Sequence, residues 1–265
     1  DIFREITKER EVWAIPWLEG DKSLWHLQPR VEKMRAHAKL AFEDDLDGVI
    51  GIHWRAEEIL DNFEALFHFS INPEDSLSTE EFYHIRYRHI YGENTSRRIS
   101  ALMTKIDQQE IFRDIPSPDY FAYRPSYGRL NQTQQNVKKE MIEEIDATIE
   151  EASNDEHIAN LRWLRANLKI ALLLDEIGRY VEPAWNLRNE MLIGNFDGHR
   201  DVEGQFLSAR EQLDKAPVKQ LFEVYATRVR SRGELGGLSS LNQRLWREVQ
   251  LLDEFLTQGF PTPGE

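Results

Sequence analysis

The fold is decided by residues 48–55, which read GVIGIHWR, together with residues 12–17, which read VWAIPW. Both are short apolar runs rich in β-branched and aromatic residues, a composition typical of buried strands. Apolar residues at helical spacing lie between the two runs: Trp25, Leu27, Val31, Met34, Ala38 and Leu40. The order strand, helix, strand predicts a right-handed parallel crossover within one sheet.

A further helix is predicted directly after the second strand. Its apolar face is formed by Ile59, Leu60, Phe63, Leu66 and Phe67. Two parallel strands alone leave both edges of a sheet open, and parallel sheets are normally covered and continued on both sides. We therefore expect residues 1–70 to be the end of a larger α/β domain whose remainder lies outside this chain.

The pattern from residue 71 to residue 265 is almost entirely helical, which predicts a mainly α protein. Ser78 is a predicted helix N-cap, and Gly92 is the predicted end of that helix. Further helices are predicted over residues 95–112, 132–152, 155–191 and 217–256, with a short helix after the turn cluster at 194–199. Within residues 155–191, Gly178 and Pro183 are expected to kink or break the helix.

The composition excludes several classes of function. The 265 residues include no cysteine, so disulfides, thiolate-bound metals and a cysteine nucleophile are impossible. With 33 Lys and Arg against 47 Asp and Glu, the net charge of −14 repels nucleic acid. No apolar run approaches the roughly 20 residues of a membrane-spanning helix, and the first residues lack the pattern of a signal peptide. We expect a folded soluble protein with no nucleic-acid partner, no membrane partner, no metal site and no cofactor, in a compartment that the sequence leaves undecided.

Functional side chains follow both predicted strands. The first strand runs into Trp17, Glu19 and Asp21, and the second runs into His53, Trp54 and Arg55. Parallel α/β sheets bind ligands at the carboxyl ends of their strands, so these side chains are expected to meet at one edge. An indole packs against the C–H face of a sugar ring, while a carboxylate accepts hydroxyl hydrogen bonds or transfers protons. The candidate catalytic residues are Glu19 and Asp21, and the candidate substrate-binding residues are Trp17, His53, Trp54 and Arg55.

Each of these candidates also has a purely structural interpretation. Glu19 and Asp21 flank a glycine in a turn, where acidic residues commonly cap the following helix. Trp54 can pack under the loop, and His53 can be a core histidine with satisfied hydrogen bonds. Arg55 can pair only with neighbouring carboxylates, namely Glu57, Glu58 or Glu19. Strand alternation places Trp13, Ile15, Trp17 and Glu19 on one face of the sheet.

A second candidate site lies in residues 228–244, where three glycines interrupt an otherwise helical pattern. Glycine costs roughly 1 kcal/mol relative to alanine in a helix interior, so this segment implies a bend or the close approach of a neighbour. The alternative is functional, with Arg232, Glu234 and Asn242 reaching the strand-end pocket as substrate-binding residues.

At these residues the sequence resembles the C-terminal part of bacterial glycoside hydrolases that have a (β/α)8 barrel followed by a helical domain. The α-glucuronidases and the β-N-acetylhexosaminidase-like enzymes are the families concerned. The resemblance is carried by residues 15–21 (IPWLEGD), 48–55, 81–93, 231–236 (SRGELG) and 242–243. It covers the first hundred residues best and the remainder loosely.

The resemblance implies that residues 1–70 are the last two βα units of an incomplete barrel and that residues 71–265 form a helical bundle domain. The implied partners are a carbohydrate substrate and the remaining part of the barrel. In such barrels the principal catalytic carboxylates come from middle strands, so Glu19, Trp54 and Arg55 are implied to line the pocket wall. The resemblance also implies that the parent enzyme is secreted or periplasmic.

Two other functions stay open at this point. One is a noncatalytic helical interaction module that docks its apolar helix faces onto a partner protein. The other is an enzyme complete in itself, which requires Glu19 to form a carboxylate pair with Glu234 or with Asp21 at a separation suited to glycoside hydrolysis.

Overall fold

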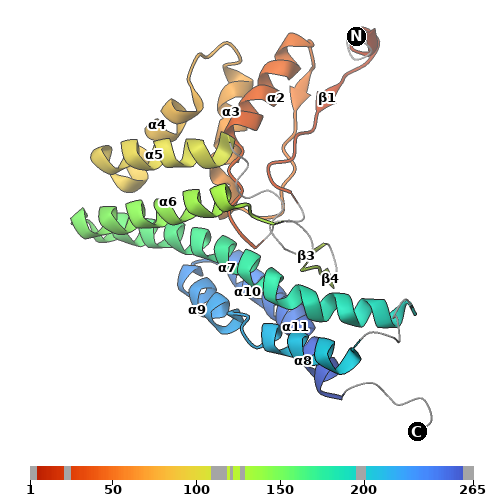
Figure 1. Ribbon diagram of the computed structural model, residues 1–265. Coiled ribbons are helices and arrows are strands. Elements are labelled where there is room, and N and C mark those ends of the chain that lie inside the picture. The colour runs from red at the N-terminus through yellow and green to blue at the C-terminus, as the bar shows by residue number, and fades with distance from the viewer. Residues whose placement is uncertain are drawn as a thin grey trace.

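The computed structural model describes residues 5–20, 25–108, 118–119, 122–125, 129–194 and 201–258, and it is mainly helical, as predicted. Figure 1 shows α6 and α7 running side by side, with the N-terminal βα layer on one side and α8 to α11 on the other. One continuous set of buried apolar side chains runs from Leu18 to Leu256 and therefore crosses residue 70, the predicted domain boundary.

The N-terminal layer is a strand-helix-strand-helix unit. It consists of β1 (Trp13–Ala14), α2 (Val31–Glu43), β2 (Gly48–Val49) and α3 (Leu60–Ile71), with a 3-10 turn (Glu57–Ile59) before α3. β1 and β2 are parallel, which confirms the predicted pairing of these segments. The pairing continues beyond the strands, because the Ile52 amide donates to the Pro16 carbonyl (3.0 Å) and the Leu18 amide donates to the Ile52 carbonyl (2.9 Å).

The expectation that both strands are buried is wrong. The side chains of Trp13, Ile15, Trp17 and Ile50 are between 43% and 54% exposed, whereas Leu18 is fully buried. The difference follows from the layering: α2 packs against both strands and against α3, which leaves the other face of the two-stranded sheet uncovered. Alternation along the chain then directs one set of side chains to the helices and the other set to solvent.

Helices α4 (Thr79–Tyr91) and α5 (Glu93–Gln108) pack against each other after this layer. Ser78 caps α4 as predicted, because its hydroxyl accepts from the Glu81 amide while the Glu81 carboxylate accepts from the Ser78 amide. Gly92 ends α4 with a positive φ of 82°, a conformation that favours glycine. After α5, β3 (Pro118–Asp119) and β4 (Ala122–Tyr123) form a short antiparallel pair.

The long helix α7 (Asp155–Leu192) contains Pro183 without interruption, so of the predicted kink or break at Gly178 and Pro183 the break is wrong, and the kink stays a prediction. Pro183 lacks the amide that would bond within the helix. Arg129, which precedes α6 (Gln132–Glu151), donates to the Gly178 carbonyl (3.3 Å) and pairs with Glu182, so the same turn gains hydrogen bonds from outside the helix.

The helix predicted over residues 217–256 is divided in the structure. It comprises α9 (Val218–Arg228), α10 (Arg232–Leu241), a π-helical turn (Asn242–Trp246) and α11 (Arg247–Gln258), after the short α8 (Val202–Leu213). The break falls before the glycines, at Ser231, which starts α10 with a second capping box. None of the helices in the described part of the chain is long and apolar enough to cross a membrane.

Candidate functional site

Glu19 fastens the two strand ends to each other. Its side chain is fully buried after β1. One carboxylate oxygen accepts from the backbone amides of Trp54 (2.6 Å) and Arg55 (2.7 Å), and the other accepts from Arg55 Nε (2.6 Å). Charge-assisted hydrogen bonds of this length are among the stronger contacts in proteins. Glu19 and Arg55 therefore lie side by side at one edge of the sheet, in agreement with the predicted meeting of the strand ends.

Two further side chains stabilise the same edge: Asn62 on α3 and Gln28 in the segment before α2. Asn62 on α3 donates to the carbonyls of Leu18 (2.8 Å) and Gln28 (2.7 Å). Gln28 in turn accepts from the Gly20 amide (2.7 Å) and donates to the Gly20 carbonyl (3.1 Å). The residues on either side of Glu19 are thus hydrogen-bonded, Leu18 to Asn62 and Gly20 to Gln28. These bonds fix the backbone from which the Glu19 carboxylate projects.

Arg55 connects this edge to further buried groups. It donates from Nη1 to the His26 carbonyl (3.0 Å), and the same nitrogen lies 3.7 Å from the Glu58 carboxylate. Arg55 therefore pairs with two of the three carboxylates that the sequence offered, Glu19 and Glu58. These contacts fix the guanidinium of Arg55, and through it they hold the loop after β2 in position.

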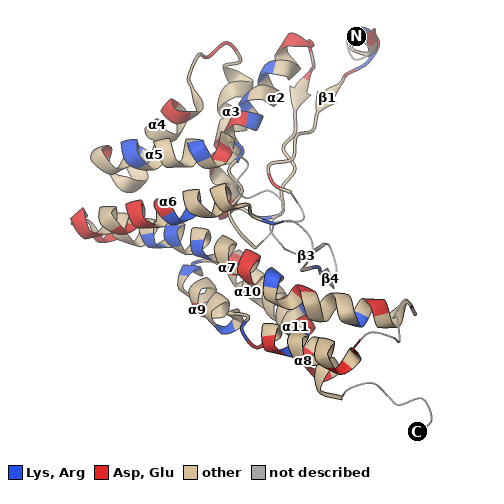
Figure 2. Cartoon of the chain, viewed as in Figure 1, with Lys and Arg blue, Asp and Glu red and all other residues tan. Residues whose placement is uncertain are grey.

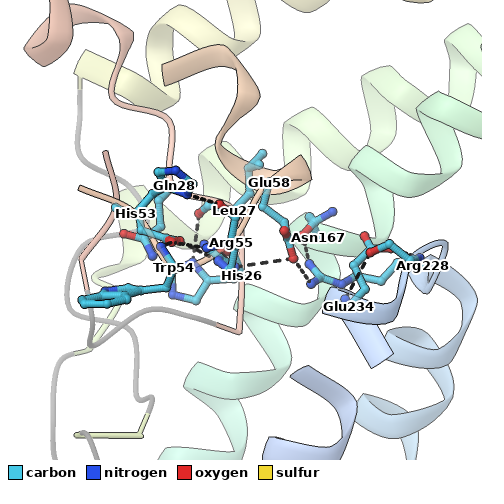
Figure 3. A network of polar contacts seen from close by, with 12 residues as sticks. His26, Leu27, Gln28, His53, Trp54, Arg55, Glu58, Asn167, Arg228 and Glu234 are labelled. Carbon is cyan, nitrogen blue, oxygen red and sulfur yellow. Dashed lines mark hydrogen bonds and ion pairs between the residues drawn. The ribbon is translucent and has the colours of Figure 1, made fainter. Parts of the chain in front are cut away.

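Glu58 extends the chain of contacts into the helical region (Figure 3). Its carboxylate accepts from Arg228 Nη2 (2.9 Å) at the end of α9, and the Arg228 side chain is fully buried. Arg228 also donates to the Tyr225 hydroxyl (2.9 Å) and to Asn167 on α7. The alternation Glu19, Arg55, Glu58, Arg228 pairs each buried charge with an opposite one, which buried charges require.

His26 lies in the same region, fully buried, with its Nδ1 3.0 Å from the Leu27 carbonyl. Burial, reinforced by the positive charges of Arg55, Lys138 and Arg228, lowers the pKa of His26 to about 3 despite that hydrogen bond. The ring is therefore neutral at physiological pH. Lys138 on α6 is also buried, and burial lowers its pKa to about 7.

Three of the predicted residues are exposed at this edge. Trp17 is 43% exposed and Trp54 is 60% exposed. His53 is exposed and its Nδ1 lies 2.8 Å from the Arg55 carbonyl, so the alternative of a core histidine is wrong.

The predicted alternation along the first strand is wrong at Glu19. Glu19 is buried, although Trp13, Ile15 and Trp17, which were predicted to share its face, are exposed. Asp21 lies outside the described residues.

In the second candidate site, the contacts of Glu234 lie at the start of α10. The Glu234 carboxylate accepts from Trp163 Nε1 (2.7 Å) and from the amides of Arg230 (2.6 Å) and Ser231 (3.1 Å). It therefore caps the N-terminus of α10. Arg232 and Asn242 are exposed. Gly237 faces Tyr225 so closely that a Cβ atom there would overlap the tyrosine hydroxyl. The structure thus favours the structural interpretation of this segment, in which a glycine allows the close approach of a neighbouring side chain, here Tyr225.

Sequence reasoning missed Arg228, Asn167 and the burial of Glu58. A signal for Arg228 was present, because it falls at helical spacing with the buried residues Val218, Leu221 and Tyr225 of α9. A charged residue in such a row indicates a buried ion pair. The partner could not be named from this signal, since Glu58 is 170 positions away.

The described residues contain no group of three or more His, Asp or Glu side chains that could hold a metal ion. No protein-family model, curated protein or solved structure matches the chain. The function must therefore be argued from the geometry of the chain itself.

Proposed function

We propose that the chain is the C-terminal portion of a carbohydrate-active glycoside hydrolase and that it contributes sugar-contacting residues to the wall of the pocket. The observation that carries this proposal is the pair of exposed indoles, Trp17 and Trp54, at the ends of two parallel strands. Trp17 forms a parallel bridge with Ile52, and Trp54 follows Ile52 by two residues. Aromatic faces at this position suit the stacking of a pyranose ring.

The hydrogen bonds of Glu19 support this role for Trp54. The backbone amide of Trp54 is fixed by a buried carboxylate, while its side chain projects into solvent. A sugar-binding indole gains affinity when its position is set before binding, because less freedom is lost on association. In this proposal Glu19 and Arg55 are positioning residues: both oxygens of Glu19 are engaged, which leaves no acid or base at that position. Among the candidate catalytic residues, Asp21 stays a prediction.

The open sheet supports the idea that the two βα units belong to a larger barrel. Both strands have an unpaired edge within the described residues, and the uncovered face carries Trp13, Ile15 and Ile50. Parallel strands occur almost only in sheets that are covered on both faces. Further strands of a (β/α)8 barrel would pair with these edges and would place other residues, including the catalytic carboxylates, at the same rim.

The test is a titration of the chain with D-glucuronic acid and N-acetylglucosamine, with tryptophan fluorescence as the readout. We expect saturable quenching that Trp17→Ala or Trp54→Ala abolishes. Trp246→Ala is the matched control, because Trp246 is 39% exposed but lies in the π-helical turn before α11. Equal quenching in all three variants, or no response to either sugar, would count against the proposal.

A noncatalytic interaction module is the second candidate, and one observation favours it. Leu60, Phe63, Phe67 and Ile71 form an apolar stripe along α3 that is between 41% and 61% exposed. Exposed apolar stripes of this kind mark surfaces that bind other proteins. An unresponsive fluorescence titration combined with loss of partner binding in Phe67→Glu would favour this function over sugar binding.

A further inference from the structure

A groove between α7 and α9 has a volume of about 380 Å³. One wall is formed by Arg162, Arg165 and Lys169, which all lie in the N-terminal half of α7. Figure 2 shows several basic segments on the ribbons of α6 and α7. The grouping is unexpected in a chain with a net charge of −14, because like charges at helical spacing repel each other.

Only one of the three cations forms an ion pair in the described part of the chain. Arg165 pairs with Asp146 of α6, with Nη2 2.8 Å from the carboxylate. Within the described part of the chain, neither Arg162 nor Lys169 has an ion-pair partner. Glu223 on the opposite wall lies 3.8 Å from Lys219 of its own helix. The groove therefore presents two cations, Arg162 and Lys169, that form no ion pair in the described structure.

The surroundings of Lys169 favour an added anion. Partial burial lowers the pKa of Lys169, and the neighbouring charge of Arg165 lowers it further, while Asp146 acts in the opposite direction. An anion bound beside Lys169 would offset both effects, because it stabilises the charged form of the amine.

The spacing of the two cations defines the shape of a ligand. Arg162 and Lys169 are seven residues apart, so they lie on the same helix face and are separated by about 10 Å along the axis. Between them the groove is lined by Ala166 and Val224, which are apolar. The Thr227 hydroxyl donates to the carbonyl of Val224 (2.7 Å), so it is engaged within its own helix.

We propose that this groove binds an elongated dicarboxylate, with one carboxylate on Arg162, the other on Lys169, and the apolar middle of the ligand on Ala166 and Val224. The proposal is independent of sugar binding at the strand ends. It predicts a dependence on ligand length as well as on charge, which distinguishes a shaped site from general attraction of anions.

The test is calorimetric titration of the full chain with suberate, the eight-carbon dicarboxylate, at low ionic strength. We expect 1:1 saturable binding, and at least about tenfold weaker binding of octanoate, which has one charge, and of succinate, which is too short. Arg162→Ala and Lys169→Ala should each weaken suberate binding about fivefold or more, whereas Lys39→Ala, which removes an exposed cation of α2, should leave it unchanged.

A second readout is the NMR titration of the Lys169 side chain, whose pKa should rise when suberate is present. Trp54→Ala should leave suberate binding intact, so failure of the sugar proposal and failure of this one are separable. The proposal is overturned if octanoate, succinate or sulfate binds as tightly as suberate, or if Lys39→Ala weakens binding as much as Arg162→Ala does.

Discussion

Arg228 donates a hydrogen bond of 2.9 Å to Glu58, a residue 170 positions earlier in the chain. The two side chains are buried, and the Glu58 carboxylate also lies 3.7 Å from Arg55 Nη1 at the strand-end edge. The position of the loop after β2 therefore depends on an ion pair with the end of α9. Four predictions follow from this arrangement and from contacts around it.

The pair Glu58 and Arg228 should show strong energetic coupling. Glu58→Gln leaves the buried Arg228 without its carboxylate partner, so it should lower the free energy of unfolding by about 3–5 kcal/mol. Arg228→Met should cost less, because Glu58 keeps its contact with Arg55 at 3.7 Å. The double variant should lose less than the sum of the two by at least about 1 kcal/mol. Urea unfolding of the four proteins measures this cycle, and effects that add within about 0.5 kcal/mol would contradict the pairing.

Glu19→Gln should destabilise the fold by about 3 kcal/mol, because the largely buried guanidinium of Arg55 loses the closer of its two carboxylate partners and keeps only Glu58, at 3.7 Å. The amide group of glutamine also brings a donor to a position where three donors already point. Glu57→Gln is the matched control, since Glu57 is exposed in the adjacent 3-10 turn and its change should stay within about 0.5 kcal/mol. Chemical unfolding compares the two, and equal small effects would exclude the anchoring role of Glu19.

Two adjacent glycines of α10 should respond in opposite directions to the same substitution. In Gly237→Ala the new Cβ overlaps the Tyr225 hydroxyl, so we expect a loss of about 1–3 kcal/mol. In Gly236→Ala the new Cβ meets nothing within 4 Å, so the better helix propensity of alanine should stabilise the fold by about 0.5–1 kcal/mol. Thermal unfolding of both variants is the measurement, and a stabilised Gly237→Ala protein would refute the close approach of Tyr225.

His26 should make the fold sensitive to acid. Its pKa is about 3 in the folded protein and about 6.5 in the unfolded chain, so the unfolded state binds more protons between these values. Stability should therefore fall as the pH falls through this window, with a contribution of about 2 kcal/mol between pH 7 and pH 5.

The measurement is the difference in unfolding free energy between pH 7 and pH 5. In His26→Gln this difference should shrink by about 2 kcal/mol relative to the parent chain. The control is His37→Gln, because His37 is exposed on α2 and the other titrating groups are common to all three proteins. An unchanged pH dependence in His26→Gln would show that the buried ring does not titrate as described.

The sequence was sufficient for features that depend on local rules. Parallel pairing of residues 12–17 with residues 48–55 followed from strand-like runs separated by a helix, and the cap at Ser78 followed from its residue type, which is favoured at helix N-caps. The meeting of Glu19 and Arg55 followed in turn from the pairing, because the carboxyl ends of parallel strands lie at one edge.

Features that depend on distant contacts could not be predicted in the same way. Pro183 is tolerated in α7 where Arg129 supplies hydrogen bonds to the same turn, and no local pattern indicates that contact. The burial of Glu19 depends on Arg55 and on the amide of Trp54, so alternation along the strand gave the wrong face. Whether a face of the sheet is covered depends on the other elements that pack on it, and the sequence of the two strands does not contain that information.

The unbroken course of α7 has a consequence for how the chain loses its structure. Its 38 residues span about 57 Å, and α4, α6, α8, α9 and α11 all pack against it. No helix among these five can detach without exposing part of the same apolar surface. We therefore expect the helices that pack on α7 to unfold together with it.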